Sequence, residues 1–479
     1  MNNKYEAVIG LEVHAQLSTK SKLFCGDSTL FGSEPNTQVS PVTLAHPGTL
    51  PKTNKKAIEF AIKMGIACGC EIEKTNYFAR KNYFYPDLPK GYQISQHTTP
   101  ICKGGQIKIK TGDTSRYVQL NRIHLEEDAG KSIHDIDEHY TCIDLNRAGT
   151  PLIEIVTEPD LFSAEEAWQY VTEVRKLVRW LNICDGNMEE GSLRCDANVS
   201  IRLRGEQQLG TKVEVKNLNS IRNVKKAIEY EIERMIREVE AGNTIRQQTR
   251  SFDALNDTTF AIRDKEEAND YRYFPDPDLP AFILAEEYIN GIAKSLPDLP
   301  AVLIVKYQES YGLSDYDAAQ LTDDKATADY FESVIQHTPS YKNVANWILG
   351  PIRQYLNEHD WGFEQFTLAP QKLAELIQLV ESGQVNFSVA AAKILPVLAV
   401  NNKSALAIAS ELQLIQVSDT NELGKWVEEA LAAMPDKVAE YKKGKKGLIG
   451  LFVGEVKKRS KGQADPKMVT QLLEEKLNK

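Results

Sequence analysis

The sequence predicts an α+β protein, with a sheet-containing N-terminal domain followed by helical domains. Segments in which apolar and polar side chains alternate, as in half-buried strands, are found before residue 281. The segment 273–280 cannot sustain regular structure, because its prolines fix φ and lack an N–H donor. Helical patterns follow one another beyond residue 295. The 479 residues are enough for about three domains, which we expect at residues 1–292, 293–405 and 406–479.

The composition is that of a globular protein with a sizeable core, since 42% of the residues are hydrophobic and 26% are charged. The apolar stretch at residues 7–17 is interrupted by polar side chains, whereas a secretory signal needs an unbroken apolar centre. The most apolar later run, residues 447–454, is far too short to span a bilayer, which takes about 20 residues. We therefore expect a cytoplasmic protein with no membrane partner.

Helix signals are clear in both halves of the chain. Ser163 and Glu166 have the spacing of a capping box and begin a helix that we expect to reach residue 182. A second helix is expected at residues 221–241 and ends at Gly242, a favourable C-terminal residue. In the second half, helices are expected at residues 327–336, 344–355, 370–381, 388–399, 422–433 and 466–477.

The net charge of −10 argues against general nucleic-acid binding, because phosphate contacts need clustered cations. Two basic clusters nevertheless lie near the C-terminus. They consist of Lys442, Lys443, Lys445 and Lys446, and of Lys457, Lys458, Arg459 and Lys461. A solvated surface and a site for nucleic-acid phosphates are both compatible with these clusters.

A predicted strand at residues 8–17 places Glu12, His14 and Gln16 on one face and apolar side chains on the other. A metal or substrate site is one interpretation of this polar face. For a single strand, however, an ordinary half-exposed surface is the more common explanation.

Acidic side chains in two further strands could bind a cation. Glu126, Glu127 and Asp128 end a strand, and a divalent cation would offset their repulsion; a solvated acidic turn is the alternative. Glu154 lies among hydrophobic neighbours in a predicted central strand. A carboxylate buried there is costly unless it is paired with a cation or bound to metal.

Cationic side chains accompany these acids. Residues 188–202 alternate cleanly and place Arg194 and Asp196 on one face, and residues 212–216 repeat the pattern with Lys216. A nucleotide with a metal ion suits such a face, although for these two strands alone a solvated hairpin with cross-strand ion pairs is the favoured explanation. Arg80 and Lys81 adjoin an aromatic, proline-rich loop that either contacts phosphate or packs on the surface. Taken together, the segments predict one sheet face that binds Mg²⁺ and a nucleotide.

Six segments resemble the B subunit family of the bacterial aspartyl/glutamyl-tRNA amidotransferases. They are residues 8–14, 80–87, 124–131, 144–154, 188–198 and 270–275. The resemblance implies a glutamine-synthetase-like sheet that forms a catalytic cradle, followed by an all-helical domain and a helical tail that binds tRNA. It also implies a heterotrimer with an amidase-type A subunit, which releases ammonia from glutamine, and a small C subunit.

The resemblance further implies that ATP phosphorylates the side-chain carboxylate of Glu-tRNA(Gln) or Asp-tRNA(Asn), and that ammonia then displaces phosphate. On this interpretation Glu12, His14, Glu126 and Glu154 bind Mg²⁺. Glu126, Lys81 and Glu127 are the expected catalytic residues, and Glu127 is also a candidate for the surroundings of the metal. The expected nucleotide-binding residues are Arg80, Lys81, Arg194, Asp196 and Lys216.

Many members of this family carry four zinc-binding cysteines after the first strand. Here Cys25 remains, and Asp27, Ser40 and Thr43 occupy the other positions. One thiolate cannot form a Cys₄ site, so we expect no zinc. Two other functions compete with the amidotransferase prediction. They are an ATP-dependent ligase that amidates a free small molecule, which would not need a long basic tail, and a non-catalytic RNA-binding scaffold, which would not need an acidic sheet face.

Overall fold

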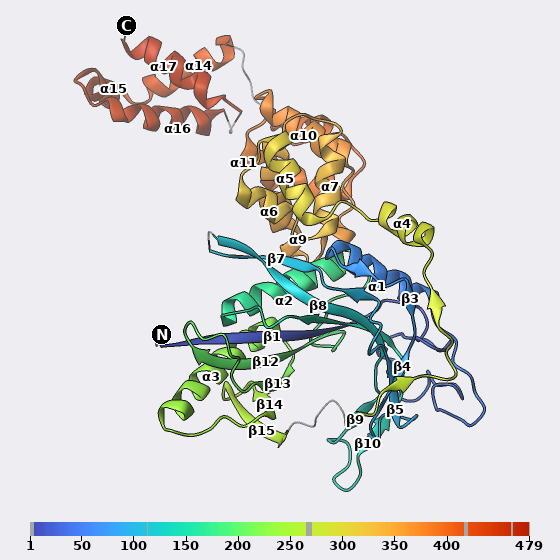
Figure 1. Cartoon of the computed structure of the whole chain (residues 1–479). Coiled ribbons are helices and arrows are strands. Elements are labelled where there is room, and N and C mark those ends of the chain that lie inside the picture. Colours follow the sequence, from blue (N-terminus) through green and yellow to red (C-terminus); the bar gives the residue numbers. More distant parts are fainter. Residues whose placement is uncertain (1–3, 113, 265–270, 416–419, 461–462, 479) are drawn as a thin grey trace. The chain divides into compact units, whose positions relative to one another are not determined.

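The computed structural model describes residues 4–112, 114–264, 271–415, 420–460 and 463–478. The chain divides into two compact units, Met1–Leu299 and Pro300–Lys479 (Figure 1). Unit 1 contains a large sheet and its helices, and the described part of unit 2 is helical, which confirms the α+β prediction. The predicted boundary after residue 405 stays a prediction. Asp270 and Lys461, which the sequence patterns include, lie outside the described residues.

Unit 1 is built around a ten-stranded sheet in which β1 (Tyr5–Gln16) is a central strand. β1 pairs antiparallel with β12 (Leu193–Leu203) on one side and with β11 (Pro151–Thr157) on the other. Beyond β12 the order is β13 (Val213–Leu218), β14 (Gln248–Asp253) and β15 (Thr258–Asp264). Beyond β11 it is β8 (Thr114–Glu127), β6 (Cys102–Lys103) and β2 (Glu71–Ile72), and β7 (Gln106–Thr111) also pairs with β8.

Three small sheets add to this framework. One combines β16 (Phe274–Pro275), β4 (Ala79–Asn82) and β5 (Tyr92–Ser95). The other two pair β9 (Lys131–Ile133) with β10 (Cys142–Asp144), and β3 (Thr75–Asn76) with β17 (Phe282–Ile283).

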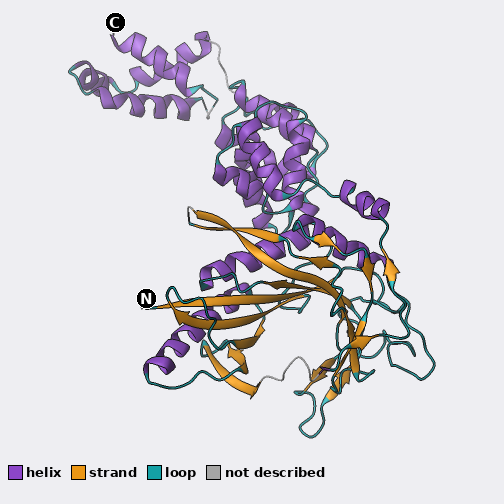
Figure 2. Ribbon diagram, viewed as in Figure 1, coloured by secondary structure: helices purple, strands orange, loops and turns teal. Residues whose placement is uncertain are grey.

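Helices α1 (Lys55–Ala67), α2 (Ala164–Trp180) and α3 (Ile221–Glu240) pack on the large sheet (Figure 2). The core between sheet and helices takes Ile9, Leu11 and Val13 from β1, all of which are fully or almost fully buried. Because side chains alternate along a strand, Glu12 and His14 must lie on the other face. The helices thus cover the apolar face and leave the polar face available for a site. A further helix of unit 1, α4 (Glu286–Lys294), contributes Ile292 to the core.

Both predicted helices of the first unit are confirmed. The Ser163 hydroxyl accepts a hydrogen bond from the backbone N–H of Glu166 at 3.1 Å and caps α2. The Glu166 carboxylate accepts from the backbone N–H of Phe162 at 2.8 Å, one residue before the position that a regular capping box uses. α3 ends at Glu240, and Gly242 has a φ of +80°, which a glycine adopts without strain.

Unit 2 is a series of helices. The predicted helix at residues 344–355 is part of a longer run, in which α8 (Tyr341–Trp347) continues through a π-helical turn at Ile348–Ile352 into α9 (Arg353–Glu358). The wider turn contains Pro351, which has no N–H to donate and would clash with the preceding turn of a regular α-helix. A second π-helical turn, at Ala390–Ile394, joins α11 (Phe387–Val389) to α12 (Leu395–Val400).

The other α-helices in the described part of unit 2 are α5 (Pro300–Tyr311), α6 (Asp315–Leu321), α7 (Lys325–Ile335), α10 (Pro370–Glu381), α13 (Ala405–Glu411), α14 (Thr420–Ala432), α15 (Pro435–Lys442), α16 (Ile449–Arg459) and α17 (Pro466–Asn478). Side chains from α14 to α17, among them Leu423, Phe452 and Leu473, form a hydrophobic cluster of their own. Within the described residues, every helix is too short or too polar to cross a bilayer.

Candidate active site

The register of four neighbouring strands brings polar side chains into one row. His14 on β1 lies opposite Glu154 on β11 and opposite Arg194 on β12. Glu154 in turn lies opposite His124 on β8. Directly opposed residues of antiparallel strands share a face of the sheet, so these four side chains lie side by side on the face that the helices leave open.

Glu126, two residues beyond His124 on the same face of β8, joins this row. The Nε2 atom of His14 lies 3.6 Å from Glu154 Oε2 and 4.0 Å from Glu126 Oε1. The Nε2 atom of His124 lies 3.2 Å from Glu154 Oε2 and 3.6 Å from Glu126 Oε2. Two carboxylates therefore lie between two imidazoles, and we call these four residues the histidine cluster. Ligand atoms of His14, Glu126 and Glu154 lie within 4.8 Å of one another, close enough to share a cation.

The charges of the histidine cluster are strongly coupled. Burial raises the pKa of Glu154, but His124 and His14 outweigh burial and hold this pKa well below its ordinary value. Burial lowers the pKa of His124, but Glu154 and Glu126 outweigh it and raise this pKa to about 9. Lys81 also belongs to these surroundings. Burial alone would lower its pKa, yet the charge of Glu126 raises it. Burial raises the pKa of Glu126 as well, but the hydrogen bond with His124 outweighs burial and lowers this pKa. Both carboxylates are therefore ionised at neutral pH and available as ligands.

A second group of acids lies beside the first. Glu12 on β1 is opposite Asp196 on β12, and Glu214 reaches the same place from β13. One carboxylate oxygen of each lies within 4.8 Å of the other two, and we call these residues the carboxylate cluster. Burial and the charge of Glu154 raise the pKa of Glu12, so a nearby cation would relieve the repulsion. The ammonium of Lys216 contacts Asp196 and lies 3.4 Å from Glu214.

The predicted metal ligands are thus distributed over two neighbouring clusters. Glu12 belongs to the carboxylate cluster, whereas His14, Glu126 and Glu154 belong to the histidine cluster. The carboxylate cluster offers only oxygen ligands, which Mg²⁺ prefers. The histidine cluster adds an imidazole, a donor that also suits transition metals. Both clusters fit a divalent cation by donor type, and the carboxylate cluster fits Mg²⁺ best.

Two predicted site residues lie away from these clusters. The Arg80 guanidinium donates to Asp276 at 2.8 Å and to Asp278 at 2.9 Å, and it stacks on the Tyr92 ring. Glu127 follows Glu126 on β8 and therefore points to the other face. There it accepts from Lys90 Nζ at 2.7 Å and from the backbone N–H of Ile94 at 3.0 Å.

Arg194 lies in the row but is paired with an acid. Its guanidinium donates to Asp128 Oδ2 at 2.8 Å, and Gln16 donates to the same oxygen. The last two residues of β8 and Asp128, which follows them, therefore have three different environments. Glu126 belongs to the histidine cluster, Glu127 is paired with Lys90, and Asp128 is paired with Arg194.

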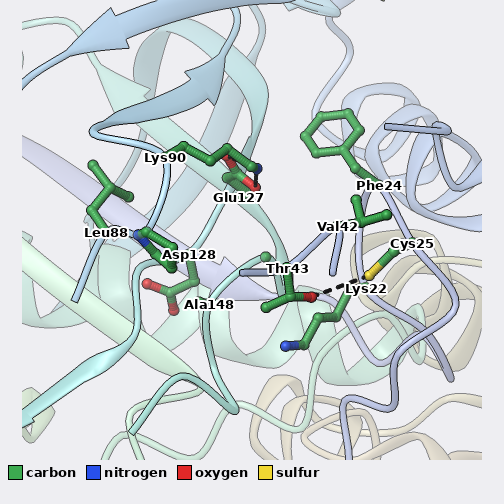
Figure 3. Close-up of a pocket in the computed structure, with 12 residues that line it drawn as sticks. Lys22, Phe24, Cys25, Val42, Thr43, Leu88, Lys90, Glu127, Asp128 and Ala148 are labelled. Atoms are coloured by element: carbon green, nitrogen blue, oxygen red, sulfur yellow. Dashed lines mark hydrogen bonds and ion pairs between the residues drawn. The ribbon is translucent and has the colours of Figure 1, made fainter. Parts of the chain in front are cut away.

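Glu127 and Lys90 line a small pocket together with Lys22, Phe24 and Thr43 (Figure 3). Cys25 also lines it, and its Sγ atom lies 3.4 Å from the Thr43 hydroxyl. That hydroxyl donates to the Asp27 carboxylate, which also accepts from the backbone N–H of Ser40 at 2.7 Å. Cys25, Asp27, Ser40 and Thr43 are thus joined by hydrogen bonds.

Two site residues were missing from the sequence prediction. His124 stands two residues before Glu126, so strand alternation alone would have placed it on the same face. Glu214 stands two residues before Lys216, and the same argument applies.

Comparisons with known proteins agree with this architecture. Residues 7–290 match the family described as the GatB/GatE catalytic domain, and residues 329–477 match the family described as the GatB domain. Proteins named as the B subunit of an aspartyl/glutamyl-tRNA(Asn/Gln) amidotransferase are similar over their whole length. The chain is 48% identical to the one from Thermodesulfovibrio yellowstonii, over 98% of each chain, and 48% identical to the one from Geotalea daltonii, over 99% of each.

Clustered carboxylates of this kind can hold the divalent cations that assist phosphoryl transfer. These matches show that the chain belongs to the GatB/GatE family. The first unit of this chain corresponds to the catalytic domain of that family. The resemblance identified from the sequence is therefore confirmed.

Proposed function

We propose that this chain is the component of a tRNA-dependent amidotransferase that activates the side-chain carboxylate of Glu-tRNA(Gln) or Asp-tRNA(Asn) with ATP. The observation that carries the proposal is the presence of two acidic clusters, next to each other on one open sheet face, with Lys81 and Arg194 beside them. The names of the similar amidotransferase proteins support the choice of substrate.

Activation is necessary because a carboxylate does not react usefully with ammonia. In the first step a carboxylate oxygen attacks the γ-phosphorus of ATP, and ADP leaves with the electrons of the broken bond. In the second step ammonia attacks the carbonyl carbon of the acyl phosphate, and inorganic phosphate leaves. The products are Gln-tRNA(Gln) or Asn-tRNA(Asn). Positioning and neutralisation of charge account for most of the catalysis of phosphoryl transfer.

The residues of the open face have complementary roles in this scheme. The carboxylate cluster, and His14, Glu126 and Glu154, would hold divalent cations. Bound Mg²⁺ neutralises charge on the phosphate groups. Lys81 stays protonated because Glu126 is near, so it can stabilise negative charge that develops on the transferred phosphoryl group or on the acyl carbonyl. The carboxylate of Asp128, which also accepts from Gln16, holds Arg194 in one arrangement beside His14.

The partners follow from the division of labour. The sequence has no amidase signature, so ammonia would come from an amidase-type A subunit, and a small C subunit would complete a heterotrimer. The tRNA would contact the basic helices of the tail. Lys442, Lys443, Lys457 and Lys458 are exposed there, which leaves their charges available to phosphate.

We also propose that the segment with Cys25, Asp27, Ser40 and Thr43, which follows β1, binds no zinc. A single thiol and the hydrogen bonds around Asp27 take the place of a metal site. Elemental analysis of the purified complex tests this proposal directly. A zinc content below about a tenth of an equivalent agrees with it, and one equivalent that a Cys25→Ser substitution removes would contradict it.

Oxygen-isotope transfer tests the activation step. Glutamyl-tRNA labelled with ¹⁸O in both side-chain carboxylate oxygens is converted by the assembled complex with ATP and glutamine. One ¹⁸O should appear in inorganic phosphate, because the oxygen that bonds to phosphorus leaves with it. Label in AMP would indicate adenylation, and unlabelled phosphate would indicate that ATP does not react with the carboxylate. Either result would refute the proposal.

A further inference from the structure

Arg122 on β8 is a further cation on the open face of the large sheet. It lies opposite Val156 on β11, which in turn lies opposite Glu12 on β1. Directly opposed residues share a face of the sheet, so these three residues form a second row beside the row of the histidine cluster. Arg122 also precedes His124 by two residues and therefore lies on the same face of β8. Its side chain thus stands next to the candidate active site.

The guanidinium of Arg122 makes no ion pair with any acid that the structure describes. Its Nη1 donates to Asn121 Oδ1 at 3.3 Å. Its Nε is buried, and neither Nε nor Nη2 has an acceptor in the described part of the chain. By contrast, Arg194 on the same face donates to Asp128 at 2.8 Å. A buried donor without an acceptor costs stability, and a bound oxyanion would offset that cost.

The free edge of Arg122 has the geometry that a carboxylate needs. Nε and Nη2 can donate in parallel to the two oxygens of one carboxylate or phosphate group. Arg234 on α3 holds Glu231 in this way, with Nε at 3.1 Å from Oε1 and Nη2 at 2.8 Å from Oε2. Arg122 presents the same edge with none of the described carboxylates on it. Its ligand is therefore expected to be an oxyanion that a substrate supplies.

Two stacked rings lie close to Arg122 and to Lys81. The rings of His97 and Tyr273 are nearly parallel, at 6°, and their centroids are 4.1 Å apart. Burial lowers the pKa of His97, and the charge of Arg122 lowers it further, so these two side chains are neighbours. Burial raises the pKa of Tyr273, and the charge of nearby Lys81 partly opposes this effect. The two rings and the two cations therefore border the same part of the open face.

The position of Arg122 relative to the acids favours the acceptor carboxylate over the phosphates as its ligand. In phosphoryl transfer the attacking oxygen and the leaving group lie roughly in line, on opposite sides of the transferred phosphorus. The carboxylate cluster, which suits the cations that accompany phosphate groups, comes from β1, β12 and β13. Arg122 lies on the other side of β1, two strands away, at roughly 10 Å in the sheet. An acid held there approaches the phosphorus from the side away from the carboxylate cluster.

We propose that Arg122 binds the side-chain carboxylate of Glu-tRNA(Gln) or Asp-tRNA(Asn) through its Nε–Nη2 edge and orients one oxygen toward the γ-phosphorus of ATP. The stacked rings of His97 and Tyr273 contact the methylene groups of the aminoacyl side chain. Because a guanidinium pairs with a carboxylate and not with a neutral amide, Arg122 also distinguishes the substrate from its amidated product. This inference rests on the proposed function, since it assigns a binding residue to the carboxylate that ATP activates.

The test compares the binding of substrate and product. Glu-tRNA(Gln) and Gln-tRNA(Gln) differ only in a carboxylate and an amide, so the ratio of their dissociation constants isolates the contact. Filter binding to the assembled complex with Mg²⁺, but without ATP and glutamine, gives both constants. Arg122→Gln removes the charge, and Arg122→Lys keeps the charge but loses the fork. Lys103→Gln is the matched control, because Lys103 lies opposite Arg122 on β6 and is paired with Glu73.

Wild type should bind Glu-tRNA(Gln) at least about tenfold more tightly than Gln-tRNA(Gln). Arg122→Gln should bring this ratio to about one, Arg122→Lys should give an intermediate value, and Lys103→Gln should keep the wild-type ratio. AMPPNP, a non-hydrolysable ATP analogue, should bind Arg122→Gln within about threefold of wild type. Thermal unfolding of Arg122→Gln should match that of wild type, because the substitution breaks no ion pair among the described residues.

A wild-type ratio that persists in Arg122→Gln would place the carboxylate elsewhere and overturn the inference. If AMPPNP binding also weakens by about tenfold while the ratio persists, Arg122 holds a phosphate of the nucleotide instead. If Arg122→Gln does not fold, Arg122→Lys decides: a ratio closer to one supports the proposal, and an unchanged ratio overturns it. Labelled phosphate in the oxygen-isotope experiment would leave the proposed function intact in each of these cases, whereas unlabelled phosphate would overturn both.

Discussion

Glu126 and Glu127 follow one another on β8, yet their carboxylates lie on opposite faces of the sheet. Glu126 lies 3.6 Å from the Nε2 atom of His124, in the histidine cluster, whereas Glu127 is paired with Lys90 at 2.7 Å. The two residues carry the same charge and are both buried, so substitutions at the two positions separate a role in chemistry from a role in stability.

Glu126→Gln should abolish amidation without unfolding the protein. The substitution keeps the shape of the side chain but removes the charge that the proposed cation and Lys81 need. We expect ATP-dependent amidation to fall by about 100-fold or more, with partial retention of glutaminase activity in the complex. Amidation and glutamine hydrolysis are measured on the same preparation. Normal amidation at saturating Mg²⁺ would show that Glu126 is no ligand.

Glu127→Ala should destabilise unit 1, because it leaves the ammonium of Lys90 buried without its partner. The side chains of Lys90 and Glu127 are 13% and 3% exposed, and breaking a buried pair of this kind costs about 3 kcal/mol. Urea denaturation gives the free energy of unfolding. The double variant Lys90→Met with Glu127→Leu should recover part of the loss, since it removes both charges. A stability equal to that of wild type in the single variant would contradict the buried pair.

The Asp27 hydrogen bonds predict a pH-dependent stability. Burial raises the pKa of Asp27, but the bonds from Thr43 and Ser40 outweigh burial and hold the pKa below its ordinary value. A depressed pKa stabilises the folded state above the unfolded pKa, about 3.9, and this contribution is lost as the pH falls through the folded value. The stability difference between wild type and Asp27→Asn should therefore be constant above about pH 5 and shrink toward about pH 3. A difference that does not change over this range would rule out an ionised Asp27 as the centre of the network.

Replacing Lys442, Lys443, Lys445 and Lys446 with Gln should weaken tRNA binding and flatten its salt dependence. Each lost phosphate contact lowers the slope of log K against log salt by about 1. Affinities at several salt concentrations give the slope. Lys403→Gln is the control, because Lys403 lies outside the two basic clusters and is paired with Glu411 at 2.7 Å. An unchanged slope in the quadruple variant would make the basic cluster a solvated surface.

Alternation along single strands predicted much of the open face. The sequence placed Glu12 with His14, and Arg194 with Asp196, and the sheet keeps both pairs together. It did not predict which strands are neighbours. The contact between His14 and Glu154 depends on β11 lying beside β1, which no local pattern encodes.

Long-range partners explain the other differences. Arg80 is paired with Asp276, which lies 196 residues further along the chain. The partner of the Arg80 guanidinium therefore could not be identified from neighbouring residues in the sequence. The separation of Glu12 from the other predicted ligands likewise depends on Glu214, which comes from β13. The sequence pattern also predicted one uninterrupted helix at residues 344–355. It did not predict the π-helical turn that contains Pro351.

Pulsed EPR of the Mn²⁺-loaded complex tests the central claim most directly, because an imidazole nitrogen bound to Mn²⁺ modulates the electron spin echo. His14 is the imidazole whose Nε2 atom lies with Glu126 and Glu154 in a candidate cation site. We predict the nitrogen modulation in wild type and in His337→Ala, a control at an exposed histidine of unit 2, and its loss in His14→Ala. Modulation that persists undiminished in His14→Ala would show that the histidine cluster does not hold the metal as described.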